Sequence, residues 1–312
     1  MPLPATEHAE LGEQLVWDID GRDWPHRRHS EFVNAAGIRW HVQRFGEDRE
    51  TTASVPLVLL IHGTGSSSHS WRDVAPLLAE RCRVLSVDLP GHGFTSMPPA
   101  HEQTLPGMAG KLAALLTAMN LSPQLLIGHS AGAAVAARMA LDNAIKPSAI
   151  ISLNGAFMGF GGLAGQLFSP FARLLAAGSF ASRFFAWQAK DSAVLDKLVR
   201  STGSVLDPTG MKLYAQLVRN PGHVSAALAM MAHWDLAPLE RELPLLKIPV
   251  WLVAAENDLT VPPSQAIKVA RLLTRPTTVL WPMLGHLAHE ESPAQCAKLV
   301  AEVVTAATDR SA

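Results

Sequence analysis

The side chains best suited to chemistry lie in a short segment, Gly128-His129-Ser130-Ala131-Gly132, between an apolar run and an alanine-rich stretch. This is a G-x-S-x-G pattern between a predicted strand and a predicted helix, where the chain must turn sharply. The flanking glycines remove Cβ clashes, so Ser130 can adopt a strained backbone conformation that holds its hydroxyl above a sheet. The start of the following helix favours negative charge that develops beside the serine. The pattern therefore predicts Ser130 as a nucleophile for acyl transfer.

A serine hydroxyl needs a base to take its proton and a third group to orient that base. Asp258 follows the apolar run 250–254, and His286 follows the apolar run 277–281. Functional residues gather at the carboxyl ends of parallel strands, and in this arrangement the chain order is serine, then acid, then histidine. We therefore predict Asp258 as the orienting acid and His286 as the base.

Two neighbouring residues compete for these roles. Glu256 lies two residues before Asp258, and His289 lies three residues after His286. We expect Glu256 to face elsewhere or to cap a loop, and His289 to make a structural hydrogen bond. The pattern favours Asp258 and His286.

A glycine-rich loop follows the apolar run 56–61 and reads His62-Gly63-Thr64-Gly65. The backbone N–H groups of Thr64 and Ala131 are the predicted donors of an oxyanion hole. The alternative is a loop that binds phosphate, but the sequence has neither the GK[ST] continuation nor a second glycine at dinucleotide spacing.

Several histidines lie near the predicted strand ends, including His62, His92, His129 and His286. Imidazoles are common metal ligands. Because no HxxxH pair or carboxylate–histidine cluster accompanies them, we predict no metal and no cofactor, and expect loop-orienting hydrogen bonds plus one catalytic base. The candidate substrate contacts are His62, His129, Phe157, Phe160, Trp187 and His223.

The elements that position these residues alternate along the chain. Apolar runs with little alternation, separated by helical stretches, indicate a mostly parallel sheet with helices on both faces. A β-hairpin is expected at 31–34 and 38–45. Further strands are predicted at 56–61, 83–87, 124–128, 148–153, 250–254 and 277–281, and helices at 70–80, 105–119, 131–142, 263–273 and 294–307.

This alternation breaks between about residues 155 and 241, a segment that contains seven of the ten phenylalanines. An aromatic, helical insertion after the sixth strand is typical of a cap over a sheet. The predicted domains are an N-terminal arm at 1–30, an α/β core at 31–154 and 242–312, and a helical cap at 155–241. The phenylalanines suit a large flat ligand, although a cap needs apolar contact with its core whatever it binds.

Composition excludes several classes of protein. The 26 Lys and Arg against 27 Asp and Glu give a net charge of −1, which argues against a nucleic-acid binder. With 48% hydrophobic and 17% charged residues, the chain is not largely disordered. Two cysteines outside any CxxC pair, no secretory signal and no apolar span of about 18 residues predict a cytoplasmic protein.

Together, the segments 62–65, 88–93 and 128–132, with Asp258 and Gly285-His286, resemble the α/β-hydrolase superfamily. The resemblance extends from about residue 38 to the C-terminus. It implies the α/β-hydrolase fold and a Ser-His-Asp triad, and the chain shows no departure from that pattern at the three catalytic positions.

Longer segments are similar to the magnesium chelatase accessory proteins of bacteriochlorophyll biosynthesis. This resemblance implies a role at or near magnesium insertion into protoporphyrin, with magnesium chelatase subunits as partners. The implied ligand is a flat apolar ring with carboxylate or ester arms, and pigment intermediates that partition into the photosynthetic membrane imply peripheral membrane contact through the cap. The segments are 21–26, 40–43, 62–72, 88–95, 220–223 and 285–291.

Three functional hypotheses follow. The first is a serine hydrolase that acts on an ester of a porphyrin side arm. The second is a non-enzymatic factor that binds a tetrapyrrole for magnesium chelatase, since fold does not fix function. The third is a general esterase or C–C bond hydrolase unrelated to pigment. An intact triad favours the first, and Ser130 argues against dehalogenase or epoxide-hydrolase chemistry, which needs an aspartate nucleophile in this fold.

Overall fold

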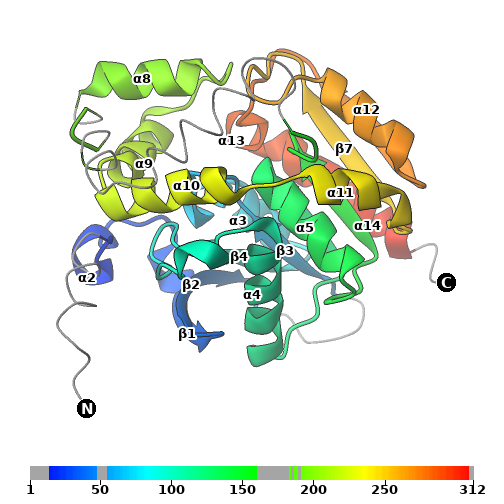
Figure 1. Cartoon of the computed structure of the whole chain (residues 1–312), viewed down its shortest axis with the longest axis horizontal. Coiled ribbons are helices and arrows are strands. Elements are labelled where there is room, and N and C mark those ends of the chain that lie inside the picture. Colours follow the sequence, from blue (N-terminus) through cyan, green and yellow to red (C-terminus); the bar gives the residue numbers. More distant parts are fainter. Residues whose placement is uncertain (1–13, 48–54, 160–182, 184–185, 189–190, 309–312) are drawn as a thin grey trace.

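A computed structural model describes residues 14–47, 55–159, 183, 186–188 and 191–308 of the chain. Its centre is an eight-stranded sheet in the order β1-β2-β4-β3-β5-β6-β7-β8 (Figure 1). β1 and β2 form an antiparallel hairpin and β2 pairs antiparallel with β4, whereas the other strands run parallel. The strands are β1 (Ser30–Ala35), β2 (Ile38–Phe45), β3 (Leu57–Ile61), β4 (Arg83–Val87), β5 (Leu125–His129), β6 (Ala149–Leu153), β7 (Val250–Ala255) and β8 (Pro276–Trp281).

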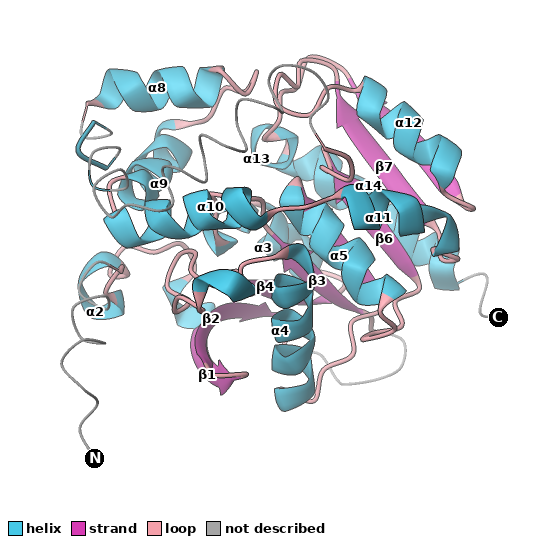
Figure 2. Cartoon of the chain, in the orientation of Figure 1, coloured by secondary structure: helices cyan, strands magenta, loops and turns pink. Residues whose placement is uncertain are grey.

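Helices cover both faces of this sheet (Figure 2). One face packs against α4 (Leu105–Ala118), α5 (Ala131–Leu141), α11 (Ala237–Glu242) and α12 (Ser264–Leu272). The other face packs against α3 (Val74–Ala79) and α14 (Pro293–Thr308). The predicted α/β-hydrolase fold, with a mostly parallel sheet and helices on both faces, is confirmed.

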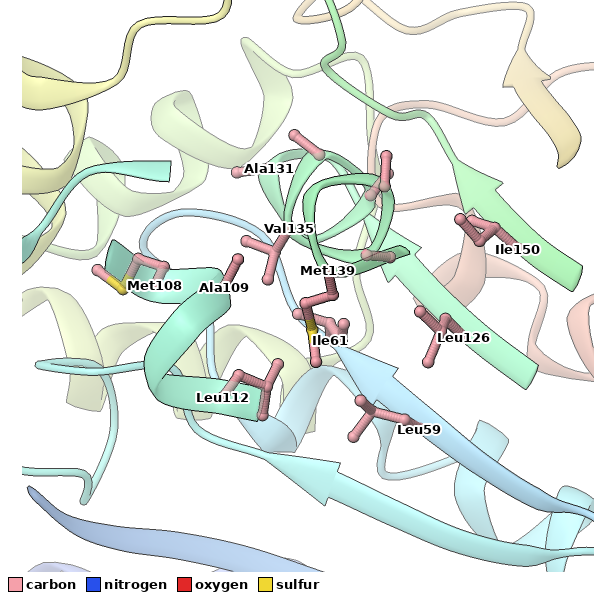
Figure 3. Close-up of a cluster of buried hydrophobic side chains, with 14 of the residues drawn as sticks. Leu59, Ile61, Met108, Ala109, Leu112, Leu126, Ala131, Val135, Met139 and Ile150 are labelled. Atoms are coloured by element: carbon pink, nitrogen blue, oxygen red, sulfur yellow. The ribbon is translucent and has the colours of Figure 1, made fainter. Parts of the chain in front are cut away.

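The central strands are apolar throughout because both of their faces are buried. Every residue of β3, β5 and β6 is buried. Figure 3 shows side chains of α4 and α5, among them Leu112, Val135 and Met139, meeting Leu59, Ile61 and Leu126 of the sheet. This packed layer fixes β5 and α5, between which Ser130 lies.

Three described helices of the insertion between β6 and β7 are α8 (Ser192–Arg200), α9 (Pro208–Val218) and α10 (Pro221–His233). They begin after Asp191, Asp207 and Asn220, whose side chains accept backbone N–H groups of the first turn. Together we call α8, α9 and α10 the cap helices. The limits predicted for the arm, core and cap stay a prediction.

The arm also packs onto the cap helices. Its short helix α2 (Trp17–Asp20) and Trp24 contribute to an apolar cluster with Phe94 of the core and Leu213 and Leu217 of α9. The side-chain amide of Gln216 on α9 donates to the Asp20 carbonyl over 2.6 Å. The arm therefore joins α9 to the core.

Candidate active site

Ser130 lies at the sharp turn between β5 and α5, where the sequence predicts it. Its backbone has φ 50° and ψ −117°, a strained conformation for a residue with a side chain. A Cβ at Gly132 would collide with the carbonyl oxygen of Ile61, and one at Gly128 would collide with the Gly132 backbone. The turn is held by hydrogen bonds from the Ser130 N–H to Leu153 and from Ala156 to the Ser130 carbonyl.

Asp258 and His286 meet at the carboxyl ends of β7 and β8. The Nδ1 atom of His286 lies 2.8 Å from Oδ2 of Asp258, and both side chains are buried. The other carboxyl oxygen, Oδ1, accepts the backbone N–H groups of Thr260 and Val261, each over 2.8 Å. Because a carboxylate only accepts, His286 carries its Nδ1 proton toward Asp258 and leaves Nε2 for another proton. This is the geometry of an oriented base.

The two competing residues lie elsewhere. Glu256 is exposed, and its carboxylate accepts the N–H of Met283 in the loop before His286, as expected of a loop cap. The ring of His289 is buried and packs 4.5 Å from the rings of Trp71 and His129. Among the described residues neither of its nitrogens has a hydrogen-bond partner, so ring packing takes the place of the expected structural hydrogen bond. Burial lowers the pKa of His289 to about 3.

Sequence reasoning missed Asn154, which directly follows β6. Its Nδ2 donates over 2.7 Å to Oδ2 of Asp258, the same oxygen that accepts from His286. The backbone of Asn154 is left-handed, with φ 51°, a conformation that asparagine tolerates better than most residues. The strand-end rule that singled out Asp258 would also have found Asn154, because β6 and β7 are neighbours.

His129 contacts both the backbone and the ring of His286. Its Nε2 lies 2.9 Å from the carbonyl oxygen of His286, and the two rings are 4.7 Å apart. Because a carbonyl only accepts, His129 donates this hydrogen bond. Burial lowers its pKa well below the usual value. The geometry gives His129 contact with His286, and its predicted contact with substrate stays a prediction.

The residues proposed for the oxyanion hole flank Ser130. Ala131 begins α5, and Thr64 lies in the 63–66 loop that follows β3. A Cβ at Gly63 would lie 3.0 Å from the Ser130 Cβ, so this loop runs directly beside the serine. The ring of His62 holds it: Nδ1 donates to the Gly63 carbonyl over 2.7 Å, and Nε2 accepts the N–H of Leu89 over 2.8 Å.

The other residues predicted to contact substrate differ in burial and in their hydrogen-bond partners. His62 is fully buried with both ring nitrogens taken by backbone groups, which leaves neither for a ligand. Phe157 is buried in the core, whereas Trp187 is 63% exposed. Phe160 lies outside the described residues. His223 of α10 bonds backbone groups of two loops, Gly65 and Gly93.

Within the described ranges, no group of three or more His, Cys, Asp or Glu side chains is placed to hold a metal ion. In the same ranges no helix has the length and apolar character needed to cross a bilayer.

Comparison with known proteins agrees with this geometry. Residues 58–299 match the alpha/beta hydrolase family. The magnesium-chelatase 30 kDa subunit of Rhodobacter capsulatus is 37% identical over 268 residues, which cover 86% of this chain and 92% of that protein. The pimeloyl-[acyl-carrier protein] methyl ester esterase of Aeromonas hydrophila is 31% identical over 229 residues, covering 71% and 82% of the two chains.

Among solved structures, an alpha/beta hydrolase fold protein from Burkholderia ambifaria aligns with a TM-score of 0.71 and 25% identity, over 87% of this chain and 99% of that one. The chain therefore belongs to the alpha/beta hydrolase family and is a homologue of the magnesium-chelatase 30 kDa subunit.

Proposed function

We propose that the protein is a serine hydrolase that cleaves a carboxylic ester through Ser130, His286 and Asp258. One observation carries the proposal: a buried histidine is oriented by a fully hydrogen-bonded aspartate at the sheet edge where a serine is held in a strained turn. A strained backbone persists only where its surroundings over-determine it, and such strain gathers at functional sites.

In the proposed reaction, Nε2 of His286 takes the proton of the Ser130 hydroxyl as its oxygen attacks the ester carbonyl. Asp258 holds the imidazole in the required tautomer and stabilises the imidazolium that forms. The N–H groups of Thr64 and Ala131 stabilise the negative charge on the carbonyl oxygen. His286 then protonates the departing alcohol, and water releases the acid from the acyl-enzyme by the same steps.

A fluorophosphonate probe tests this proposal. The intact mass of the wild-type protein should increase by one adduct, and Ser130→Ala should remain unlabelled while keeping its melting temperature. Because the elbow turn itself is strained, Ser130→Gly serves as a second variant that removes the hydroxyl and relieves the backbone. Labelling that persists in both variants would refute Ser130 as the nucleophile.

The proposed substrate is an ester on or near a magnesium porphyrin. Two relatives support this: one is named as a subunit of magnesium chelatase, and another is an esterase that acts on a methyl ester. A tetrapyrrole with esterified side arms combines both features. The phenylalanine-rich part of the cap that would suit such a ring lies largely outside the described residues.

A second candidate function is a non-enzymatic accessory factor that binds a tetrapyrrole for magnesium chelatase subunits. The 37% identity to the chelatase subunit favours it, because that name describes an assembly and not a hydrolysis. Titration with a magnesium porphyrin should quench tryptophan fluorescence saturably at micromolar concentration. Quenching by a protein that the fluorophosphonate does not label would favour this candidate, and labelling without quenching would favour an esterase unrelated to pigment.

We propose further that the protein is cytoplasmic and touches the membrane surface through its cap. Helix α8 buries Leu195 and Val199 but exposes Val194, Leu198 and Lys197. Apolar side chains next to a cation are typical of a helix that rests on an anionic lipid surface. Sedimentation with vesicles containing anionic lipid, compared for the wild-type protein and Leu198→Glu, tests this contact.

A further inference from the structure

Three consecutive residues of the 63–66 loop each contact the cap. The Thr64 hydroxyl lies 3.4 Å from the sulfur of Met230 on α10. The Gly65 carbonyl accepts from Nε2 of His223, also on α10, over 3.1 Å. The Ser66 hydroxyl lies 3.2 Å from the Tyr214 hydroxyl on α9. In Figure 1 these two helices lie below α8.

The opposite end of the same loop is held by the core. His62 donates to the Gly63 carbonyl, and Gly63 itself packs against His129 and Ser130. Gly65 has φ 75° and the Ser66 N–H donates to the Gly63 carbonyl over 3.2 Å, so residues 63–66 form a tight turn between the two supports. The orientation of the Thr64 N–H, which lies between them, therefore depends on both the core and the cap.

His223 makes the most specific of the cap contacts. It is 3% exposed and lies in the first turn of α10, where its own N–H is accepted by Asn220. Its Nδ1 accepts the N–H of Gly93 over 3.1 Å, while Nε2 donates to Gly65. A carbonyl only accepts and an N–H only donates, so a single neutral tautomer satisfies both loops.

We propose that His223 is a positioning residue, which fixes the 63–66 loop so that the Thr64 N–H faces the developing oxyanion only when the cap is docked. This inference rests on the proposed serine hydrolase and deepens it: the cap completes the oxyanion hole instead of only covering the site. An oxyanion-hole donor acts through its exact direction, and a displacement of about 1 Å is enough to cost about 100-fold in rate.

The test compares His223→Leu, His223→Gln and the matched control His233→Leu, which makes the same substitution at an exposed position of the same helix. In His223→Leu we expect fluorophosphonate labelling of Ser130 to slow by about 10- to 100-fold, the range for a displaced donor. The pH dependence of labelling should keep its shape, because the acid and base are untouched. Glutamine retains an N–H for the Gly65 carbonyl and should recover part of the rate.

Hydrogen exchange of the peptide that spans 62–72 gives a readout independent of chemistry. His223→Leu should lose protection at the 63–66 amides, while His233→Leu keeps it. Equal labelling rates and equal protection in all variants would overturn the proposal. If the wild-type protein is not labelled at all, the serine hydrolase itself fails, and unchanged exchange in His223→Leu would then separately overturn the coupling of cap and loop.

Discussion

The acid and base of the candidate site lie among core elements, whereas the 63–66 loop is divided between core and cap. Asp258 receives all four of its hydrogen bonds from Asn154, His286 and the two N–H groups of its own loop. The 63–66 loop is held on one side by His62 and on the other by His223 and Tyr214. We call the acid and base with their core surroundings the core half of the site, and the 63–66 loop with the cap residues that hold it the cap half. The acid and base are hydrogen-bonded to the cap insertion through backbone around His286 and Leu259, whereas the 63–66 loop is held by side chains of the cap helices.

This difference concerns two properties of an enzyme site: the orientation of the base and the orientation of the oxyanion donor. The carboxylate that orients the base takes its hydrogen bonds from core groups, and the base is hydrogen-bonded to the cap insertion through the backbone around His286, at Thr202 and Ser204, so movement of the cap should disturb the base less than the donor loop. A donor loop shared with the cap links activity to closure, which is how movable lids complete other catalytic sites. The comparison predicts that substitutions in the core half and the cap half affect rate and stability in different ways.

The largest expected effect comes from breaking the ion pairs of Arg72, of which the pair with Asp207 joins the core to the cap. Arg72 is 5% exposed and contacts Glu290 of α13 (Ala288–Glu291) over 2.6 Å and Asp207 before α9 over 3.2 Å. The Tyr214 hydroxyl donates to the same Glu290 carboxylate. Burial raises the pKa of Glu290 to about 7 against the opposing charge of Arg72. Replacing Arg72 by methionine should lower the free energy of unfolding by about 3 kcal/mol, the cost of an uncompensated buried partner.

Urea denaturation measures this loss. The control is Arg200→Met on α8, which breaks an exposed pair with Asp196 and should change the free energy by less than about 1 kcal/mol. Arg72→Met should also slow the labelling of Ser130, because it releases the cap from the core. If the two variants lose the same stability, Arg72 does not fasten the cap.

A smaller effect is expected in the core half, at Asn154. Removing its side chain in Asn154→Ala takes one N–H donor from the charged Asp258, which is worth about 1.5–3 kcal/mol of unfolding free energy. The catalytic rate constant should fall about tenfold because the carboxylate is less firmly oriented toward His286. Steady-state hydrolysis of an activated ester and urea denaturation measure the two quantities.

Asn120→Ala is the matched control. Asn120 is also left-handed, with φ 52°, but it is exposed after α4 and far from Asp258 in the sheet order. It therefore reports the backbone cost of replacing asparagine at positive φ. Asn154→Ala must lose more than this control in both rate and stability, and equal losses would mean that Asn154 does not act through Asp258.

The core half of the site could be predicted from the sequence because strand ends carry their own signal. Apolar runs fix β5, β7 and β8, and in a parallel sheet the residues that follow these strands gather at one edge. The G-x-S-x-G pattern predicts Ser130, and this rule together with the chain order predicts Asp258 and His286. Asn154 follows β6 by the same rule, but it is missed because its uncharged amide is neither an acid nor a base.

The cap half could not be predicted in this way. His223 was predicted as a substrate contact, and nothing in its local sequence indicates that Gly65 and Gly93, more than 100 residues away, would occupy both ring nitrogens. The same holds for Arg72, whose partners Asp207 and Glu290 are brought to it only by the docking of α9 and α13. Such contacts depend on tertiary placement and leave no periodic pattern.

The smallest effect per residue is the pH dependence of stability, to which buried histidines of both halves contribute. Among the described residues, six buried histidines have lowered pKa values because burial disfavours their charged form: His62, His69, His92, His129, His223 and His289. Each binds a proton more readily in the unfolded chain, so its contribution to stability is complete above about pH 6.5 and is lost as the pH falls toward its folded value. That value is about 4 for His223 and about 3 for His289.

Each of these histidines contributes up to about 1.4 kcal/mol per pH unit in that window, whereas Glu290 opposes them with a single proton between its ordinary pKa and about 7. The free energy of unfolding, measured in urea at pH 7.5, 6.5 and 5.5, should therefore decrease as the pH is lowered. His289→Phe in the core half and His223→Gln in the cap half should each lower the slope of this free energy against pH by up to the contribution of one proton, about 1.4 kcal/mol per pH unit. A free energy of unfolding that does not change with pH would contradict neutral imidazoles in both halves. A slope that His289→Phe lowers but His223→Gln does not would mean that the cap opens before His223 is protonated.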